Sequence, residues 1–314
     1  GNRYCTKLIL DLAAQPADSI ATAVLPEMFV GAVKTILQAA AGFQNPLSGV
    51  DPSLAAYALQ LPDEATLLNQ MTVIDIDRLH AARTHVKNKI AAELRCDFER
   101  VYSAAAEKLT AEYQFTPAEV GRRRLQNTCL EYLTCSGSAG AVAVAKSQYD
   151  RSTCMTDKIA ALSCLVSIPS PETTAALADF HKEAAGHNLV LNKWFMVQAM
   201  SGHDNIHDRV RELKAHPDFL LSNPNRARSL IGAFSANLYH FHAADGRGYE
   251  FLADSIIEID KLNPQVSARM VTAFAQWKSF DEGRRALMEA QLRRIQSQEK
   301  LSKDALENVL RCLK

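Results

Sequence analysis

Glycine is scarce in this sequence, at 13 of 314 residues, or about 4% where roughly 7% is usual. Valine, isoleucine and threonine do not gather into alternating runs, whereas alanine and leucine are abundant. A half-buried strand needs that alternation, and turn-rich β proteins need glycine. The composition therefore argues against sheets and favours helices.

An excess of charge of one sign is also absent, because 35 basic residues balance 35 acidic residues. A protein that binds nucleic acid or an anionic membrane mainly through its overall field carries an excess of Lys and Arg. Aromatic residues make up 7% of the chain and are scattered, so no base-stacking platform is indicated. Neither class of partner is expected.

Paired cysteine motifs are absent, although there are seven cysteines. Their number is odd and no C-x-x-C spacing occurs, so a disulfide framework is not expected. We interpret them as reduced, mostly buried thiols of a cytoplasmic protein. The seven are Cys5, Cys96, Cys129, Cys135, Cys154, Cys164 and Cys312.

No long uninterrupted apolar run occurs near the start of the chain. The most apolar early stretch, residues 20–43, contains Pro26, Glu27 and Lys34, so it does not read as a membrane span. No secretory signal is recognisable. The chain starts without Met, in what reads as the middle of a helix, so we expect it to be part of a larger protein.

Helical periodicity runs through almost the whole sequence. After Asp75, apolar residues recur every three or four positions from Leu79 to Val101, which predicts a helix of about 25 residues. Capping residues precede many such segments, as in Thr116-Pro117-Ala118-Glu119. The spacing predicts about 14 to 18 helices with short connections, as in HEAT- and armadillo-like repeats. The expected fold is all-α, a superhelical solenoid of helix pairs forming a single domain, residues 1–314.

Two Asn-Pro pairs carry the clearest functional signal. Asn223-Pro224 and Asn263-Pro264 each combine a preferred N-cap with proline at the first helical position. An arginine follows in the second turn of each helix, Arg228 and Arg269. A helix N-terminus attracts anions, and a guanidinium can grip a carboxylate with two hydrogen bonds. The pair predicts recognition of an anion rather than catalysis, although pairing of each arginine with an acidic neighbour would explain the spacing equally well.

These segments resemble the C-terminal helical domain of bacterial-type aminopeptidase N, in the M1 family of zinc metallopeptidases. The resemblance extends from about residue 3 to the C-terminus. It is carried by NPNRARSLIGAF (223–234), FHAADGRGYEF (241–251), NPQVSAR (263–269), NKWF (192–195), MTD (155–157), RLQNTCL (124–130) and DPSLAA (51–56). Nothing in the chain resembles the family's catalytic domain.

The resemblance implies a non-catalytic part of an enzyme that removes N-terminal residues from peptides. It implies that an upstream domain of the same polypeptide holds the Zn²⁺ and the catalytic residues, and that this chain encloses the active-site chamber. By the same resemblance, Arg228, Arg269 and Gln265 face that chamber and contact the distal part of a peptide, while Arg226 and Asn225 are structural. We expect no catalytic residue and no metal ligand in this chain.

Other interpretations remain open from the residues alone. The chain could be a free-standing helical scaffold that binds a protein partner. It could also be a metal hydrolase using His203 and His207, which are four residues apart, but Asp204 stands where zinc peptidases have glutamate. For His240 and His242 we expect hydrogen bonding in a bend. For Arg122, Arg123 and Arg124 we expect one inward side chain and two solvated ones, and for Trp194 and Phe195 a place in the core.

Overall fold

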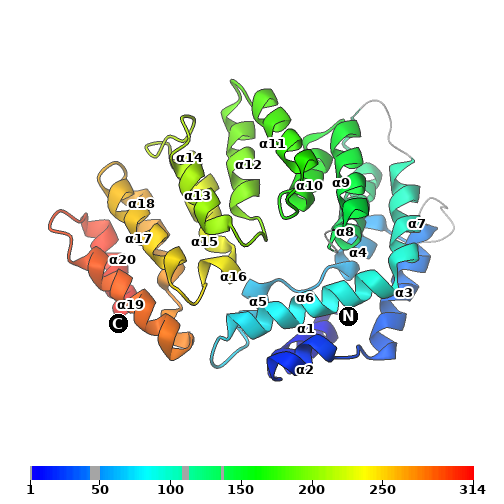
Figure 1. Cartoon of the computed structure of the whole chain (residues 1–314), viewed down its shortest axis with the longest axis horizontal. Coiled ribbons are helices and arrows are strands. Elements are labelled where there is room, and N and C mark those ends of the chain that lie inside the picture. The colour runs from blue at the N-terminus through cyan, green and yellow to red at the C-terminus, as the bar shows by residue number, and fades with distance from the viewer. Residues whose placement is uncertain (1, 43–49, 108–112, 136–137) are drawn as a thin grey trace. The chain divides into compact units, whose positions relative to one another are not determined.

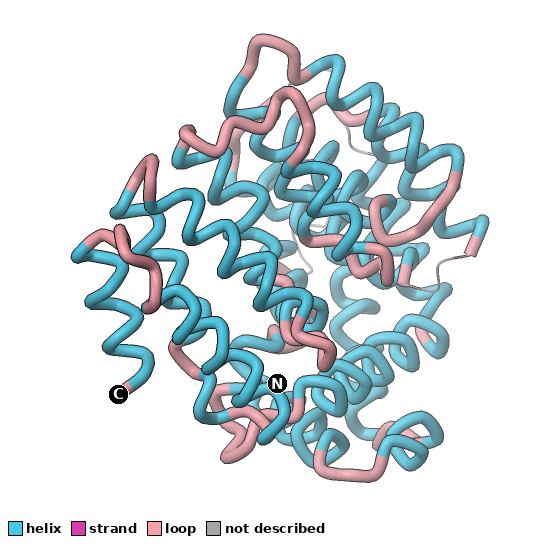
Figure 2. The backbone as a smooth tube through the Cα atoms, turned by 60° about the vertical axis from the view of Figure 1, so that its left-hand side comes forward, coloured by secondary structure: helices cyan, strands magenta, loops and turns pink. Residues whose placement is uncertain are grey.

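Helices make up the regular secondary structure of the residues that the structure describes (Figures 1 and 2). The computed structural model describes residues 2–42, 50–107, 113–135 and 138–314. Within these ranges the only extended pairing is an isolated bridge between Ile74 and Phe280. The all-α prediction is confirmed.

The helices of the described residues include several single-turn pieces, so they outnumber the 14 to 18 expected. In chain order they are α1 (Asn2–Ala13), α2 (Ala17–Thr22), α3 (Glu27–Ala41), α4 (Pro52–Leu59), α5 (Glu64–Leu68), α6 (Ile76–Glu93), α7 (Arg95–Ala106), α8 (Pro117–Thr134), α9 (Ala139–Arg151), α10 (Met155–Leu165), α11 (Pro171–Glu183), α12 (Asn188–Ala199), α13 (Ile206–Lys214), α14 (Pro224–Ala227), the π-helical η2 (Arg228–Gly232), α15 (Ala233–Ala236), α16 (Leu238–Phe241), α17 (Arg247–Asp260), α18 (Pro264–Val271), the 3₁₀ turns η3 (Thr272–Phe274) and η4 (Trp277–Ser279), α19 (Glu282–Gln296) and α20 (Lys303–Leu313).

Side-chain caps set the starts of several helices, as their sequences predict. The Thr116 side chain accepts a hydrogen bond from the Glu119 backbone N–H at 3.3 Å, and α8 begins at Pro117. The Ser302 hydroxyl caps α20 by accepting from the Ala305 N–H at 3.2 Å. Each cap satisfies a donor that the first turn leaves unpaired, so these starts are fixed locally.

The long helix expected after Asp75 is interrupted. Its apolar stripe is buried as predicted, but the backbone leaves helical geometry at Leu94, where φ is −111° and ψ is 21°. Two helices, α6 and α7, therefore replace one. Hydrophobic spacing continues across Leu94, so the stripe alone could not reveal the break.

The chain folds into two compact units. Unit 1 comprises Gly1–Asn69 and Asp77–Ala178, and unit 2 comprises Gln70–Ile76 and Asp179–Lys314. The boundary between Ala178 and Asp179 falls inside α11, which is one continuous helix. The organisation as a single domain, residues 1–314, stays a prediction.

Helix α8 is central to unit 1, because it packs against α4, α7, α9 and α10. Its buried residues include Leu125, Cys129 and Leu130, all at 0% exposure. In unit 2, α17 packs against α18 and α19, and α18 packs against α20 (Figure 1). Phe234 and Phe241 lie edge to face in the unit 2 core, with ring centroids 6.2 Å apart.

Two glycines of the described residues adopt the left-handed conformation. Gly186 has φ of 80° after the end of α11, where this conformation is common, and Gly246 has φ of 76° before α17. Gly202, which follows α12, has no positive φ. The backbone N–H groups of Met200 and Ser201 bond back to α12, so the helix end is satisfied without Gly202.

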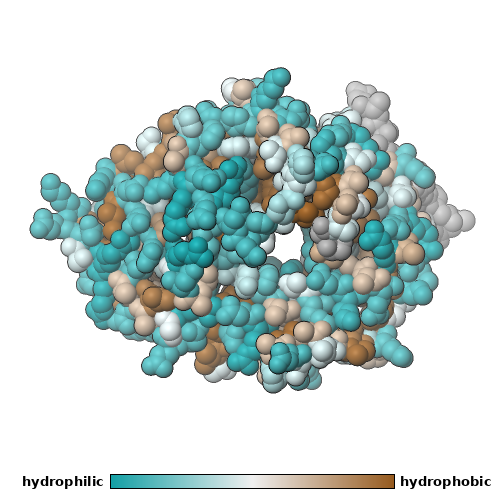
Figure 3. Space-filling view, in the orientation of Figure 1, coloured by the Kyte–Doolittle hydropathy of each residue, from teal (hydrophilic) through white to brown (hydrophobic). Residues whose placement is uncertain are grey.

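Hydrophilic residues cover most of the face seen in Figure 3, with hydrophobic residues scattered between them. Among the described residues we find no helix that is both long and apolar enough to cross a membrane.

Candidate functional site

Arg228 and Arg269 line one surface cavity of unit 2. The cavity has a volume of about 300 Å³, and both arginine side chains are exposed. Its walls come from two stretches of chain: η2 with the α15 that follows it, and α18 with the η3 that follows it. The remaining lining residues are Gly232, Ser235, Ala236, Val266, Met270, Thr272 and Ala273. Two cations on different helices thus share one small concave space.

The two Asn-Pro caps place these arginines. The Asn223 side chain accepts from the backbone N–H groups of Asn225 at 3.0 Å and Arg226 at 3.3 Å, and α14 begins at Pro224. The Asn263 side chain accepts from the Val266 N–H at 3.2 Å, and α18 begins at Pro264. Both helix starts agree with the sequence prediction.

Arg228 is the first residue of the π-helical segment η2. A π-helical turn is rare, and such turns are frequently found at functional sites. It changes the direction in which following side chains leave the helix relative to a regular α-helix. The sequence analysis did not anticipate this feature, because a single inserted residue leaves no clear trace in hydrophobic spacing.

Neither arginine pairs with an acidic side chain within 4.0 Å among the residues that the structure describes. The Arg228 guanidinium donates to the Asn225 side-chain oxygen at 3.3 Å, a neutral partner. The alternative in which each arginine bridges two helices through an acid therefore finds no support in these contacts. Gln265 is exposed one turn before Arg269 and does not line the cavity.

Arg226, two residues before Arg228, is buried and structural, as expected. Its side chain is 2% exposed and donates to the Asn192 side chain at 2.7 Å, to the Asn188 side chain at 3.3 Å and to the backbone oxygen of Asp218. Its guanidinium carbon lies 5.1 Å from the centre of the Phe195 ring. These contacts join α12, α14 and the segment before α14.

The histidine pairs considered from sequence occupy different surroundings. His203 is partly exposed, and its Nδ1 lies 2.5 Å from the Asn205 side-chain oxygen. His207 is 3% exposed, with its ring edge-on to Phe234. Because one ring faces solvent and the other faces the core, these two do not form a shared ligand pair.

His242 lies in the core of the bend before α17. Its side chain is 4% exposed, and its Nδ1 lies 3.0 Å from the Tyr249 hydroxyl. Burial, together with the positive charge of Arg284, lowers the pKa of His242 from 6.5 to about 3. The expected hydrogen-bonding role agrees with this geometry, and the partner is Tyr249.

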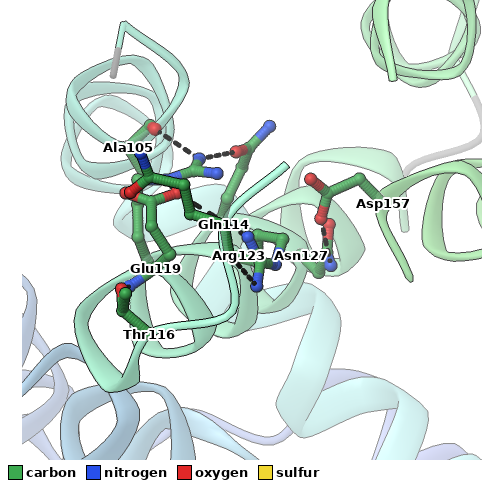
Figure 4. Close-up of polar contacts among 9 residues, drawn as sticks. Ala105, Gln114, Thr116, Glu119, Arg123, Asn127 and Asp157 are labelled. Carbon is green, nitrogen blue, oxygen red and sulfur yellow. Dashed lines mark hydrogen bonds and ion pairs between the residues drawn. The ribbon is translucent and has the colours of Figure 1, made fainter. Parts of the chain in front are cut away.

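The prediction for the arginine run in α8 is wrong. Arg122 and Arg123 are 3% and 5% exposed, and Arg124 is exposed, so two of the three side chains are inward. Arg123 donates to the backbone oxygen of Gln114 at 3.1 Å (Figure 4). Arg122 donates to Glu119 at 2.9 Å and to the backbone oxygen of Ala105 at 2.8 Å. Two guanidinium groups are tolerated because Glu119 and backbone oxygens satisfy them.

A known protein family matches the full length of the chain. Its model, described as "Domain of unknown function (DUF3458_C) ARM repeats", matches residues 1–314. The chain belongs to this family. The prediction of an armadillo-like all-α fold is thereby confirmed a second time.

Curated relatives carry the name expected from the sequence motifs. The chain is 36% identical to aminopeptidase N of Haemophilus influenzae and 34% identical to that of Escherichia coli, over 84% of this chain in each case. It is also similar to aminopeptidase N of Caulobacter vibrioides, with 36% identity over 82% of the chain. The resemblance stated above is confirmed. The chain spans about 30% of the length of these relatives.

A solved structure shares the fold over nearly the whole chain. The crystal structure of Legionella pneumophila aminopeptidase A in complex with aspartic acid matches with a TM-score of 0.86 and 27% identity. The match covers 99% of this chain and 36% of that one. This DUF3458_C chain therefore corresponds to a part of known aminopeptidases.

Proposed function

We propose that this chain is the non-catalytic C-terminal domain of a zinc aminopeptidase that removes N-terminal residues from peptides. In that enzyme it encloses the active-site chamber, limits access to it and contacts the carboxyl part of the peptide. The shared cavity of Arg228 and Arg269, on a chain similar to about 30% of aminopeptidase N, is the observation that carries this proposal.

The catalytic zinc belongs to the upstream domain of the same polypeptide in this proposal. The sequence His-Glu-x-x-His, which supplies two ligands and a general base in many zinc peptidases, does not occur in the 314 residues. No chemical step is therefore assigned to this chain, which acts on the peptide only by shape and charge. The cytoplasmic location stays a prediction from the cysteine pattern.

Arg228 and Arg269 would bind the free carboxylate at the far end of a peptide. Both are exposed, both line the same cavity, and no described acid neutralises either one. A carboxylate entering the cavity would meet two guanidinium groups, each capable of paired hydrogen bonds. Gln265, exposed one turn before Arg269, would contact the peptide outside this cavity.

Kinetics of the full-length enzyme test this role. We expect Arg228→Ala and Arg269→Ala to lower kcat/KM for tri- and tetrapeptides by more than about two-fold, which corresponds to about 0.5 kcal/mol. The same peptides with an amidated C-terminus should respond much less, because they carry no carboxylate. Arg285→Ala, at an exposed arginine of α19 outside the cavity, is the matched control.

Two kinetic results would count against this role of the arginines. One is a change in kcat/KM of less than two-fold for the free peptides. The other is an equal change for free and amidated peptides. Either result would exclude a role of the two arginines in binding the substrate's carboxylate. Both results would leave the family membership untouched.

A free-standing helical scaffold that binds a protein partner is the second candidate function, favoured by exposed apolar side chains such as Met28, Leu54 and Tyr57. Mixing the purified chain with the upstream part of the same protein separates the two functions. If cleavage of an alanyl substrate, or selectivity for peptide length, arises only on mixing, the result supports the aminopeptidase domain. If the activity of the upstream part does not change when the chain is added, the result supports the scaffold.

A further inference from the structure

Three side chains of unit 2 bring metal-binding atoms together away from the arginine cavity. His181 lies in the last turn of α11, and His216 and Asp218 follow α13. His181 Nε2 lies 2.8 Å from Asp218 Oδ2, and His216 Nδ1 lies 3.8 Å from the same oxygen. All three candidate ligand atoms lie within 4.8 Å of one another. We propose that His181, His216 and Asp218 bind a divalent zinc ion.

The separations suit a tetrahedral ion after small movements. With Zn–N and Zn–O bonds of about 2.0–2.2 Å, neighbouring ligand atoms of a tetrahedron lie about 3.4 Å apart. The His181–Asp218 pair would open slightly, and His216 would move toward the other two. Both movements are of about 0.5 Å, which small rotations of the three side chains would supply.

The donor set also fits zinc. Imidazole nitrogen and carboxylate oxygen both bind Zn²⁺, and three protein ligands leave a fourth position for water. The Asp218 backbone N–H donates to His216 Nδ1 at 3.2 Å, so this hydrogen bond would have to break before that nitrogen could bind the ion.

Aromatic rings hold the two imidazoles in place. The Trp194 ring centre lies 4.7 Å from that of His181 and 5.2 Å from that of His216. Arg226 donates to the backbone oxygen of Asp218 and so anchors the segment that carries two of the three ligands. Its positive charge opposes the ion, and the negative charge of the Asp218 carboxylate, as a ligand, offsets it.

The ligands remain open to solvent on one side. The side chains of His181, His216 and Asp218 are 34%, 30% and 45% exposed. An ion can therefore enter without unfolding, and its fourth ligand can be water. Bound there, zinc would tie the end of α11 to the segment between α13 and α14.

Sequence spacing could not reveal this site, because His181 and His216 are 35 residues apart. The proposal is independent of the aminopeptidase function, since none of its residues lines the Arg228–Arg269 cavity. It departs from the sequence prediction that this chain has no metal ligand.

Zinc titration of the untagged 314-residue chain tests the site. Cys96, the exposed thiol, is replaced by Ser in every sample so that it cannot bind the metal. Competition with a chromogenic chelator should show one zinc ion per chain. His181→Ala, His216→Ala and Asp218→Asn should each weaken binding by about tenfold or more, judged from the sensitivity of metal sites to their supporting residues. His203→Ala is the matched control and should bind as tightly as the parent.

Cobalt spectroscopy identifies the ligands directly. Co²⁺ bound by imidazole and carboxylate should give visible d–d bands without a thiolate charge-transfer band, and His181→Ala should abolish them. Circular dichroism of the metal-free variants checks that each is folded, and Asp218→Asn preserves the side-chain shape if an alanine variant unfolds.

Three results would overturn the proposal. They are the absence of saturable zinc binding, equal affinity in the three ligand variants and the control, and a thiolate band in the cobalt spectrum. The last two would assign the metal to other residues of the chain.

Discussion

His242 is a histidine whose buried position holds it neutral. Its ring stacks on Phe280 with centroids 4.2 Å apart, and its pKa of about 3 lies below the ordinary 6.5. The unfolded chain gains a proton near pH 6.5, whereas the folded chain does not until about pH 3. Unfolding therefore takes up a proton between these values, and stability falls as the pH falls through this window.

Substitution His242→Gln should remove this pH dependence. We expect the wild type to lose about 2 kcal/mol more of its unfolding free energy than the variant between about pH 7 and pH 5, as proton linkage requires. Urea unfolding at the two pH values measures it. His187→Gln, at an exposed histidine, should follow the wild type, and parallel curves for wild type and His242→Gln would contradict the account.

At the scale of elements, the turn between α16 and α17 depends on Gly248. A Cβ atom there would lie 2.2 Å from the backbone oxygen of Phe241, a distance that real Cβ atoms essentially never show. Without a Cβ at Gly248, the first turn of α17 can pack against the backbone of Phe241, the last residue of α16. Because the obstacle is backbone, a side-chain rotation cannot relieve it.

Gly248→Ala should therefore destabilise the chain by about 1–3 kcal/mol, the usual cost of overpacking. Gly232→Ala is the matched control in the same unit, since its Cβ would meet the Arg228 Cβ at an ordinary 3.8 Å. Helix propensity alone would make that change neutral or stabilising by about 1 kcal/mol. Equal urea midpoints for the two variants would show that the turn relaxes freely.

At the scale of the whole molecule, the chain offers a separate probe for each unit. Both tryptophans, Trp194 and Trp277, belong to unit 2, whereas the buried Cys129 belongs to unit 1. Burial raises the pKa of the Cys129 thiol, so it should react with a thiol reagent only after unit 1 opens. Helix α11 runs through the boundary between the units.

Tryptophan fluorescence and Cys129 labelling should change at the same urea concentration. A continuous helix unfolds cooperatively, so α11 favours a single transition and the single-domain prediction. Labelling at Cys129 is followed by mass spectrometry of its peptide, because Cys96 is exposed and Cys135, Cys154, Cys164 and Cys312 are only half-buried and would also react. Two separated midpoints would show that the units unfold independently and would overturn that prediction.

Local chemistry explains which features were predictable from the sequence. Caps and proline positions act within one turn, so the starts of α8, α14 and α18 were predicted correctly. The resemblance to aminopeptidase N could also be recognised from the sequence, because its motifs are short and follow one another along the chain. The break at Leu94 and the π-helical turn at Arg228 were missed, since neither changes the hydrophobic spacing.

The sequence by itself determined the helical class, many helix boundaries and the family, because periodicity, capping and motifs are properties of neighbouring residues. Only the tertiary structure decided which cations are buried and which are free. Arg122 and Arg226 are enclosed by oxygens from distant helices, whereas Arg228 remains exposed. It also decided that His181 meets Asp218, because that contact depends on how α11 packs against residues 37 positions away.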